Sequence, residues 1–341
     1  MRSAAVAAML LTTACVSDPT TPPRTLARLE LRHSSRAVFV NAQEKLSVTA
    51  FDDGNRVMKT PELTWSSSDT SIVTIDRFGL MTGLRIGQVF ITASSGGIAS
   101  SIGLDVRAAR IRISAQSGPQ DLLVGDTAVL RGEFMDVNGD PIATDMPIRW
   151  SSGELSVLSL EPLPGHAGQR VKVTALATGL ALVIGSADGA EGAYVTAVVS
   201  AAVATPPIEV TDFHFVEYST LDDFPAFVPY VRLRVVSDHE VNLVRAEAAL
   251  EGRGPRFPAL CGTISLPAGE HEVLGIRSYP SNFFAVGGFW SPTWPPASTG
   301  VAMLTYKDET GAVTSIAVRG AVRSWSGNYI TNARAPWQLC P

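Results

Sequence analysis

The sequence predicts an all-β protein in which β-sandwich domains follow one another along the chain. A sequence motif that begins with tryptophan occurs twice, as Trp65-Ser66-Ser67 and as Trp150-Ser151-Ser152, and the two tryptophans lie 85 positions apart. Gly54 and Gly139 are separated by the same 85 positions. A repeat of this length indicates two tandem domains. Short runs in which apolar and polar residues alternate surround both copies, a pattern typical of half-buried strands.

The first fifteen residues differ in kind from the rest. Arg2 supplies one positive charge, residues 4–11 form an uncharged apolar run, and Thr12-Thr13-Ala14 places small residues before Cys15. This order is typical of a secretory signal peptide, and the apolar run is too short to span a bilayer as a mature helix. We therefore expect residues 1–15 to direct export.

Small residues before a cysteine at the end of an apolar run resemble the lipobox of bacterial lipoproteins, although Thr12 stands where that family usually has Leu. The resemblance implies that Cys15 is lipidated, becomes the first mature residue and anchors the chain to a membrane, in the outer membrane or at the cell surface. The alternative is an ordinary cleaved signal and a secreted protein. Residues 16–25, with Pro19, Pro22 and Pro23, read as an extended tether.

The cysteine count supports an exported protein. The chain has three cysteines, and an unpaired one in an exported protein requires an explanation. Lipidation of Cys15 supplies it and leaves Cys261 and Cys340 as a disulfide pair in an oxidising compartment. Two buried free thiols are the alternative.

The two repeats are expected at residues 26–107 and 108–203. In the first, alternating runs at 29–31, 46–50 and 102–106 predict strands, and Asp52-Asp53-Gly54-Asn55 predicts a hairpin turn. Trp65 and, in the second copy, Trp150 are expected to pin two sheets together as core residues. The second copy carries an insertion at Glu161–Gln169 that is rich in Pro and Gly and is expected to form a loop.

Both repeats resemble the bacterial immunoglobulin-like (Ig-like) domains of group 2, a β-sandwich family of surface proteins. The first copy matches in Trp65–Asp69, Gly79–Gly83 and Gly87–Ile91, and the second in Gly125-Asp126 and Gly179–Val183. The second copy departs from the family's glycine turn, where Pro164-Gly165-His166 stands instead. The resemblance implies a fold and says little about a ligand, because function on this scaffold lies in its loops.

The C-terminal region, residues 208–341, predicts a third β-sandwich-like domain. Six stretches alternate as strands do: 209–217, 228–236, 241–250, 273–276, 301–306 and 313–318. Between them, a Gly- and Pro-rich stretch gathers large aromatics that form a candidate binding surface: Phe283, Phe284, Phe289, Trp290 and Trp294. The alternative is that these aromatics fold back as a lid over the end of the sandwich.

Composition and motifs argue against several chemistries. Lys plus Arg number 27 and Asp plus Glu number 32, without a basic run that would bind nucleic acid. His239-Glu240 and His271-Glu272 each lack the second histidine of a zinc-protease motif and are interpreted as surface residues. The segment Asp136–Asp140 has oxygen ligands at calcium-like spacing but is better interpreted as a hydrogen-bonded turn. No metal, cofactor or catalytic residue is predicted.

These observations favour a non-enzymatic, exported lipoprotein with a structural, adhesion or binding role. Its expected partners are the membrane, through the lipid anchor, and an envelope polysaccharide or protein. Two alternatives stay open: a carbohydrate-binding module that uses the C-terminal aromatics, and an enzyme with an unrecognised site in the C-terminal domain.

Overall fold

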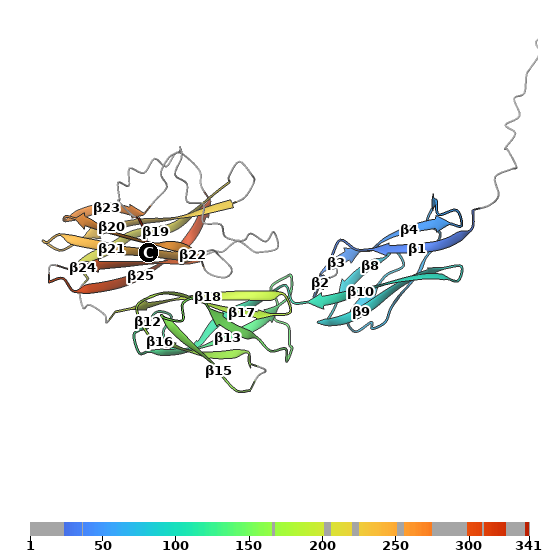
Figure 1. Cartoon of the computed structure of the whole chain (residues 1–341), viewed down its shortest axis with the longest axis horizontal. Coiled ribbons are helices and arrows are strands. Elements are labelled where there is room, and N and C mark those ends of the chain that lie inside the picture. Colours follow the sequence, from blue (N-terminus) through green and yellow to red (C-terminus); the bar gives the residue numbers. More distant parts are fainter. Residues whose placement is uncertain are drawn as a thin grey trace, which may run out of the picture. The chain divides into compact units, whose positions relative to one another are not determined.

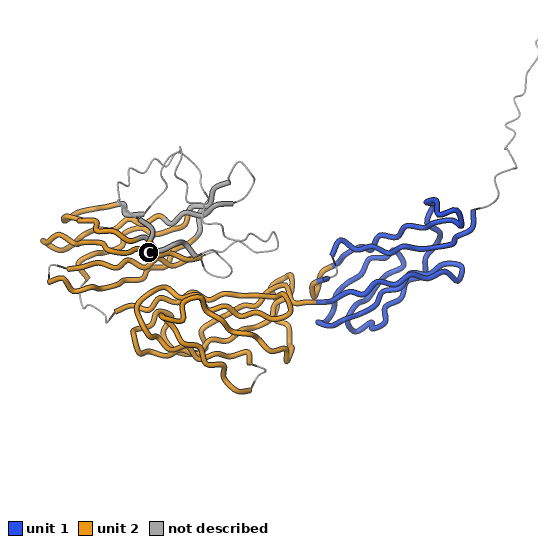
Figure 2. The backbone as a smooth tube through the Cα atoms, in the orientation of Figure 1, with its two compact units in different colours: residues 1–38, 43–106 blue, residues 39–42, 107–341 orange. Residues whose placement is uncertain are grey.

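The computed structural model describes residues 24–35, 37–165, 168–200, 206–219, 225–250, 256–274, 299–308, 310–324 and 338–340. Every regular element within these ranges is a β-strand, so none of the described residues forms a helix able to cross a membrane. The chain divides into two compact units, residues 1–38 with 43–106 and residues 39–42 with 107–341 (Figure 2). The signal segment, Cys15 and the aromatics at positions 283–294 lie outside the described residues.

The first domain is built of short strands in three sheets, β1-β4-β5, β2-β10-β9-β6 and β3-β8-β7 (Figure 1). Alternation along each strand turns apolar side chains inward: in β9, Val89, Ile91 and Ala93 are buried and Phe90 is exposed. The strands are β1 (Leu26–Arg32), β2 (Ala37–Phe39), β3 (Gln43–Lys45), β4 (Ser47–Asp52), β5 (Val57–Met58), β6 (Thr64–Ser67), β7 (Val73–Ile75), β8 (Leu80–Gly83), β9 (Gly87–Ser95) and β10 (Ile98–Arg107).

The second domain pairs two four-stranded sheets, β11-β13-β16-β15 and β12-β18-β17-β14. Buried residues of both sheets, among them Leu130, Val173 and Val183, form one core, and Trp150 packs against it. The two domains are therefore β-sandwiches, as the sequence predicts. The strands are β11 (Arg110–Ser117), β12 (Leu122–Leu123), β13 (Thr127–Met135), β14 (Arg149–Ser152), β15 (Leu158–Pro162), β16 (Arg170–Ala175), β17 (Gly179–Ala187) and β18 (Ala190–Val199).

An aspartate closes the same hairpin in both repeats. The buried Asp136 accepts backbone N–H groups from Asn138 at 2.9 Å and from Asp140 at 2.8 Å. Asp52 accepts the backbone N–H of Arg56 at 2.9 Å. The Asp136–Asp140 segment is thus the hydrogen-bonded turn that the sequence favoured over a calcium loop.

The C-terminal domain is one eight-stranded sheet that folds over a shared core, with the order β23-β20-β19-β25-β24-β21-β22-β26 (Figure 1). Strand β25 joins the two halves of this sheet. It pairs with β24 along most of its length and with β19 at its end. Phe215 and Leu233 from one half meet Leu243 and Leu304 from the other. The strands are β19 (Ile208–Ser219), β20 (Pro225–Val235), β21 (Val241–Leu250), β22 (Arg256–Leu266), β23 (Gly269–Leu274), β24 (Thr299–Lys307), β25 (Val313–Ser324) and β26 (Gln338–Leu339).

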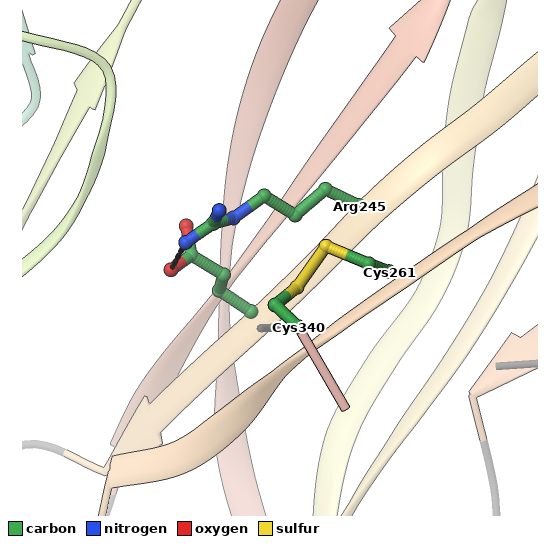
Figure 3. Close-up of a disulfide and its surroundings, with 4 residues drawn as sticks. Arg245, Cys261 and Cys340 are labelled. Carbon is green, nitrogen blue, oxygen red and sulfur yellow. Dashed lines mark hydrogen bonds and ion pairs between the residues drawn. A yellow bond between two sulfur atoms is a disulfide. The ribbon is translucent and has the colours of Figure 1, made fainter. Parts of the chain in front are cut away.

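Two of these strands, β22 and β26, have no counterpart among the six expected stretches. A disulfide between Cys261 and Cys340, the pairing expected from the sequence, joins the first of them to the chain segment that contains the second (Figure 3). The cysteines are separated by 79 positions, so the bridge restricts the unfolded chain and contributes about 4 kcal/mol to stability. Arg245 lies beside the bridge on β21 and forms an ion pair with Glu247 at 2.9 Å.

The second sandwich and the C-terminal domain belong to the same compact unit. Leu180 and Val195 of the sandwich pack with Val301 and Met303 of β24 in a small apolar cluster. At its side, Arg319 donates to Asp121 at 2.7 Å. This contact buries apolar surface of both domains.

Candidate functional site

The outer face of strands β19 and β20 carries a group of polar and titratable side chains. Alternation along the two strands sends Phe213, Phe215, Val231 and Leu233 into the core. The residues between them point to the opposite face, and we call four of these the polar cluster: Asp212, His214, Tyr230 and Arg232.

The polar cluster is held together across the strand pair. His214 lies directly opposite Tyr230, and their rings are 4.8 Å apart. His214 Nδ1 lies 3.3 Å from Asp212 Oδ1, and Arg232 donates to the Tyr230 hydroxyl at 2.9 Å. His214 and Tyr230 are each only 5% exposed, so the cluster is a packed network with Arg232 at its exposed edge.

A β-bulge beside the cluster redirects one further side chain. The register between β19 and β20 shifts between Val210 and Asp212, which leaves Thr211 as the extra residue. Its hydroxyl donates to Glu270 Oε2 at 3.2 Å, and Glu270 also accepts from Arg234 at 2.8 Å. The bulge therefore connects the cluster to β23.

These residues border a surface hollow of about 480 Å³ lined by Thr211, Asp212, Arg232, Glu270 and His271. Two carboxylates, one guanidinium, one imidazole and one hydroxyl offer both donors and acceptors over a short distance. Such a lining suits a polar ligand rich in hydroxyl groups better than a strongly charged one, because its own charges largely compensate each other.

The arrangement also limits other chemistries. An imidazole beside a carboxylate is used in general-base catalysis, but His214 is too buried to reach a substrate directly. Within the described ranges, no group of three His, Cys, Asp or Glu side chains converges as metal ligands do. The hollow is therefore a candidate for binding.

Sequence reasoning did not predict this site. The alternation of Tyr230, Arg232 and Arg234 with apolar residues was visible and indicated one polar face of a strand. It did not reveal that Asp212, His214 and His271 come from other strands to the same place. His271, interpreted as a surface residue, is half-buried at the wall of the hollow, whereas His239 is exposed.

The two tryptophans of the repeats occupy different surroundings. Trp150 packs against the core of the second sandwich, and its indole N–H donates to the carbonyl of Gly168 at 2.7 Å. Trp65 is half-buried and lies against Gly79, which has a φ of 77° and where a Cβ would lie only 2.7 Å from the indole ring. Trp65 also borders a surface hollow.

Comparison with known proteins confirms the predicted resemblance for the first domain. Residues 30–101 match the model of the bacterial Ig-like domain (group 2). Over 139 residues the chain is 24% identical to ice-binding protein 1 of Shewanella frigidimarina (strain NCIMB 400), which covers 40% of this chain and 16% of that protein. The chain thus spans less than a fifth of that relative's length.

Solved structures that align with the chain include an S-layer protein and a protocadherin. Domains 4 and 5 of the S-layer protein SbsC align with a TM-score of 0.23 and 15% identity, over 51% of this chain and 98% of that chain. Protocadherin gammaB7 domains EC3–6 align with a TM-score of 0.23 and 11% identity, over 85% of this chain and 72% of that chain.

Proposed function

We propose that this chain is an exported lipoprotein whose tandem Ig-like domains connect a lipid anchor at Cys15 to a C-terminal binding domain. Its role is structural or adhesive and not enzymatic. The observation that supports it best is the polar cluster with its hollow on β19, β20 and β23, which offers donors and acceptors for an envelope polymer.

The two kinds of domain support a division of labour. In the Ig-like domains, many charged side chains serve turns or neighbouring strands, as Asp52, Asp69 and Asp76 do. In the C-terminal domain, polar side chains of three strands meet at one hollow. Binding sites are concave and contain a few convergent polar groups, so the C-terminal domain is the better candidate for ligand contact.

The binding role is tested with two single substitutions in the mature chain. Asp212→Asn and Arg232→Gln each remove a charged partner from the hollow and are expected to weaken retention on peptidoglycan sacculi or insoluble polysaccharides at least tenfold. Asp238→Asn, an exposed position of the same domain, serves as the matched control. Unchanged retention by both variants would exclude the hollow as the contact.

The anchor is tested separately by the intact mass of the mature N-terminal peptide from a membrane fraction. A chain that begins at Cys15 and carries acyl mass is expected. An unmodified Cys15, or a chain cut elsewhere and recovered from the medium, would contradict the lipid anchor and indicate a secreted protein. Neither result depends on the hollow.

A carbohydrate-binding module is the second candidate, favoured by the mixed donors and acceptors of the hollow. The aromatics at 283–294 would add stacking surfaces for sugar rings. Alanine at Trp290 and Trp294 is expected to abolish sugar retention while the domain stays folded by circular dichroism. If sugar is retained by this double variant but lost in Asp212→Asn, the hollow alone makes the contact.

A further inference from the structure

The first Ig-like domain has a hollow of about 630 Å³ at its surface that the proposed function does not use. Its wall mixes polar and apolar surface, and the apolar part includes the half-buried Trp65 and the 63% exposed Phe78. Polar and charged side chains also line it. The lining residues are Lys45, Leu46, Val48, Thr60, Pro61, Glu62, Leu63, Trp65, Arg77 and Phe78.

The second domain fills the corresponding place with its own chain. There, the insertion between β15 and β16 ends in Gly168 and Gln169. The Gln169 carbonyl accepts the backbone N–H of Gly132 at 2.9 Å, and its side-chain amide donates to the Thr144 carbonyl at 2.7 Å. The Gly168 carbonyl accepts the Trp150 indole N–H. The backbone of Gly168 and Gln169 therefore occupies the space between β13, the loop before β14 and the tryptophan.

The first domain lacks this stretch because its hairpin is shorter. Strand β16 pairs with five residues of β13, Thr127–Arg131, whereas β8 pairs with three residues, Gln43–Lys45. The last bond on this edge of the first domain runs from the Leu46 N–H to the Gly79 carbonyl. On the other side of the gap, β5 pairs with Ala50 and Phe51.

Val48 lies in this gap and corresponds to Gly132. Both residues precede the hairpin aspartate, Asp52 or Asp136, by four positions. Alternate residues of a strand direct their N–H and C=O groups to the same edge, so Val48 presents its backbone on the edge where Leu46 meets Gly79. Gly132 uses the same backbone donor to bind the insertion.

We propose that the hollow beside Trp65 binds a short peptide segment of a partner protein, whose backbone bonds to the edge of β4 as Gln169 bonds to Gly132 of β13. Backbone hydrogen bonds to Val48 would give affinity, and contact with Trp65 and Phe78 would select a small or apolar side chain. Two cations, Lys45 and Arg77, line the hollow with one carboxylate, Glu62, so a segment without excess positive charge fits best.

The test titrates the full mature chain with a synthetic peptide, capped at both ends, that copies Pro162–Gln169 of the second domain and so omits Arg170. We expect saturable shifts of the Val48 amide and the Trp65 indole signals in heteronuclear NMR spectra at about 1 mM peptide. Trp65→Phe should weaken binding about fivefold, because it removes the indole donor. Trp150→Phe, the matched change in the filled domain, should leave binding unchanged.

A second variant keeps the proposal testable if Trp65→Phe alters the fold. Replacing the first domain's Asp76–Gly79 turn by the Glu161–Val171 segment, which keeps the register of the second domain, should close the hollow from within and abolish peptide binding. An absence of shifts at Val48 and Trp65 with the unmodified chain would overturn the proposal. So would shifts at these residues with an oligosaccharide but not with the peptide.

Discussion

The two repeated β-sandwich domains have a tryptophan and an aspartate turn at corresponding positions, yet only the second closes the edge beside its tryptophan. In the second domain a longer hairpin brings Gly168 and Gln169 onto the edge of β13, where they bond Gly132 and Trp150. In the first, the hairpin ends at Gly79 and leaves a hollow beside Trp65. A few residues in one turn thus decide whether a sandwich of this kind is closed or offers an open edge.

The largest difference is expected at the glycine of each hairpin. A Cβ at Gly79 would lie 2.7 Å from the Trp65 ring, and the residue has a φ of 77°. Gly168 has a similar φ of 73°, but a Cβ there would meet its nearest atom, the Ile148 carbonyl oxygen, at 3.7 Å. Gly79→Ala should therefore destabilise the first domain by about 3 kcal/mol, and Gly168→Ala the second by about 1 kcal/mol.

Urea unfolding of the full chain, followed through backbone amide signals of each domain, measures both changes. Following the domains separately is necessary because a multidomain chain need not unfold in one step. Equal costs at the two glycines would mean that Trp65 moves aside easily and is not a fixed wall of the hollow.

A smaller difference is expected when each tryptophan is shortened. Trp150→Phe removes the donor to the Gly168 carbonyl and part of the packing against the core, and should cost about 2 kcal/mol. Trp65→Phe should cost about 1 kcal/mol, since part of the ring borders an open hollow. The same unfolding experiment compares them, and a larger loss at Trp65 would reverse the comparison.

The hairpin aspartates should respond to acid alike but to salt differently. The backbone N–H of Arg56 and the nearby Arg56 guanidinium lower the pKa of Asp52 below its ordinary 3.8. Burial would raise the pKa of Asp136, but hydrogen bonds from the Asn41 side chain and the Asp140 backbone outweigh it and lower the pKa. Both carboxylates therefore stabilise the fold above pH 3.8, and this stabilisation is lost as the pH falls through the folded-state pKa.

Asp52→Asn and Asp136→Asn should each flatten the loss of stability between about pH 4 and pH 2. About 1 M NaCl should reduce the effect of Asp52→Asn, whose partner is a cation, more than that of Asp136→Asn, whose partners are neutral. Thermal unfolding across pH and salt measures both effects. An equal response to salt would show that the guanidinium contributes little at Asp52.

The smallest effect on stability is expected at Phe78. This side chain is 63% exposed at the hollow, so Phe78→Ser should change the free energy of unfolding by less than about 0.5 kcal/mol. Binding of the Pro162–Gln169 peptide should nevertheless weaken, because an apolar side chain of the wall is lost. A marked loss of stability would mean that Phe78 supports the hairpin and does not serve the hollow.

Much of the fold was predictable because local sequence patterns indicate it. Period-2 alternation and glycine or aspartate turns indicated the strands of both repeats, and the repeated Trp-Ser-Ser phrase indicated the family that residues 30–101 match. In the C-terminal domain, β22 was missed because Arg256–Leu266 contains Pro258 and Gly262, which weaken a strand pattern. Strand β26 is two residues long, too short for any pattern.

The sequence by itself determined the alternation that predicts the strands, the repeat, and the choice of Cys261 and Cys340 as a pair. Each of these depends on residue type, spacing or count along the chain. Only the tertiary structure decided where polar side chains converge. Asp212, Arg232 and Glu270 lie far apart in sequence and meet because β19, β20 and β23 are neighbours in a sheet. The open edge at Val48 likewise arises because neither β5 nor β8 pairs with β4 at this residue. Which distant strands pair cannot be read from the alternation of apolar and polar residues in either strand.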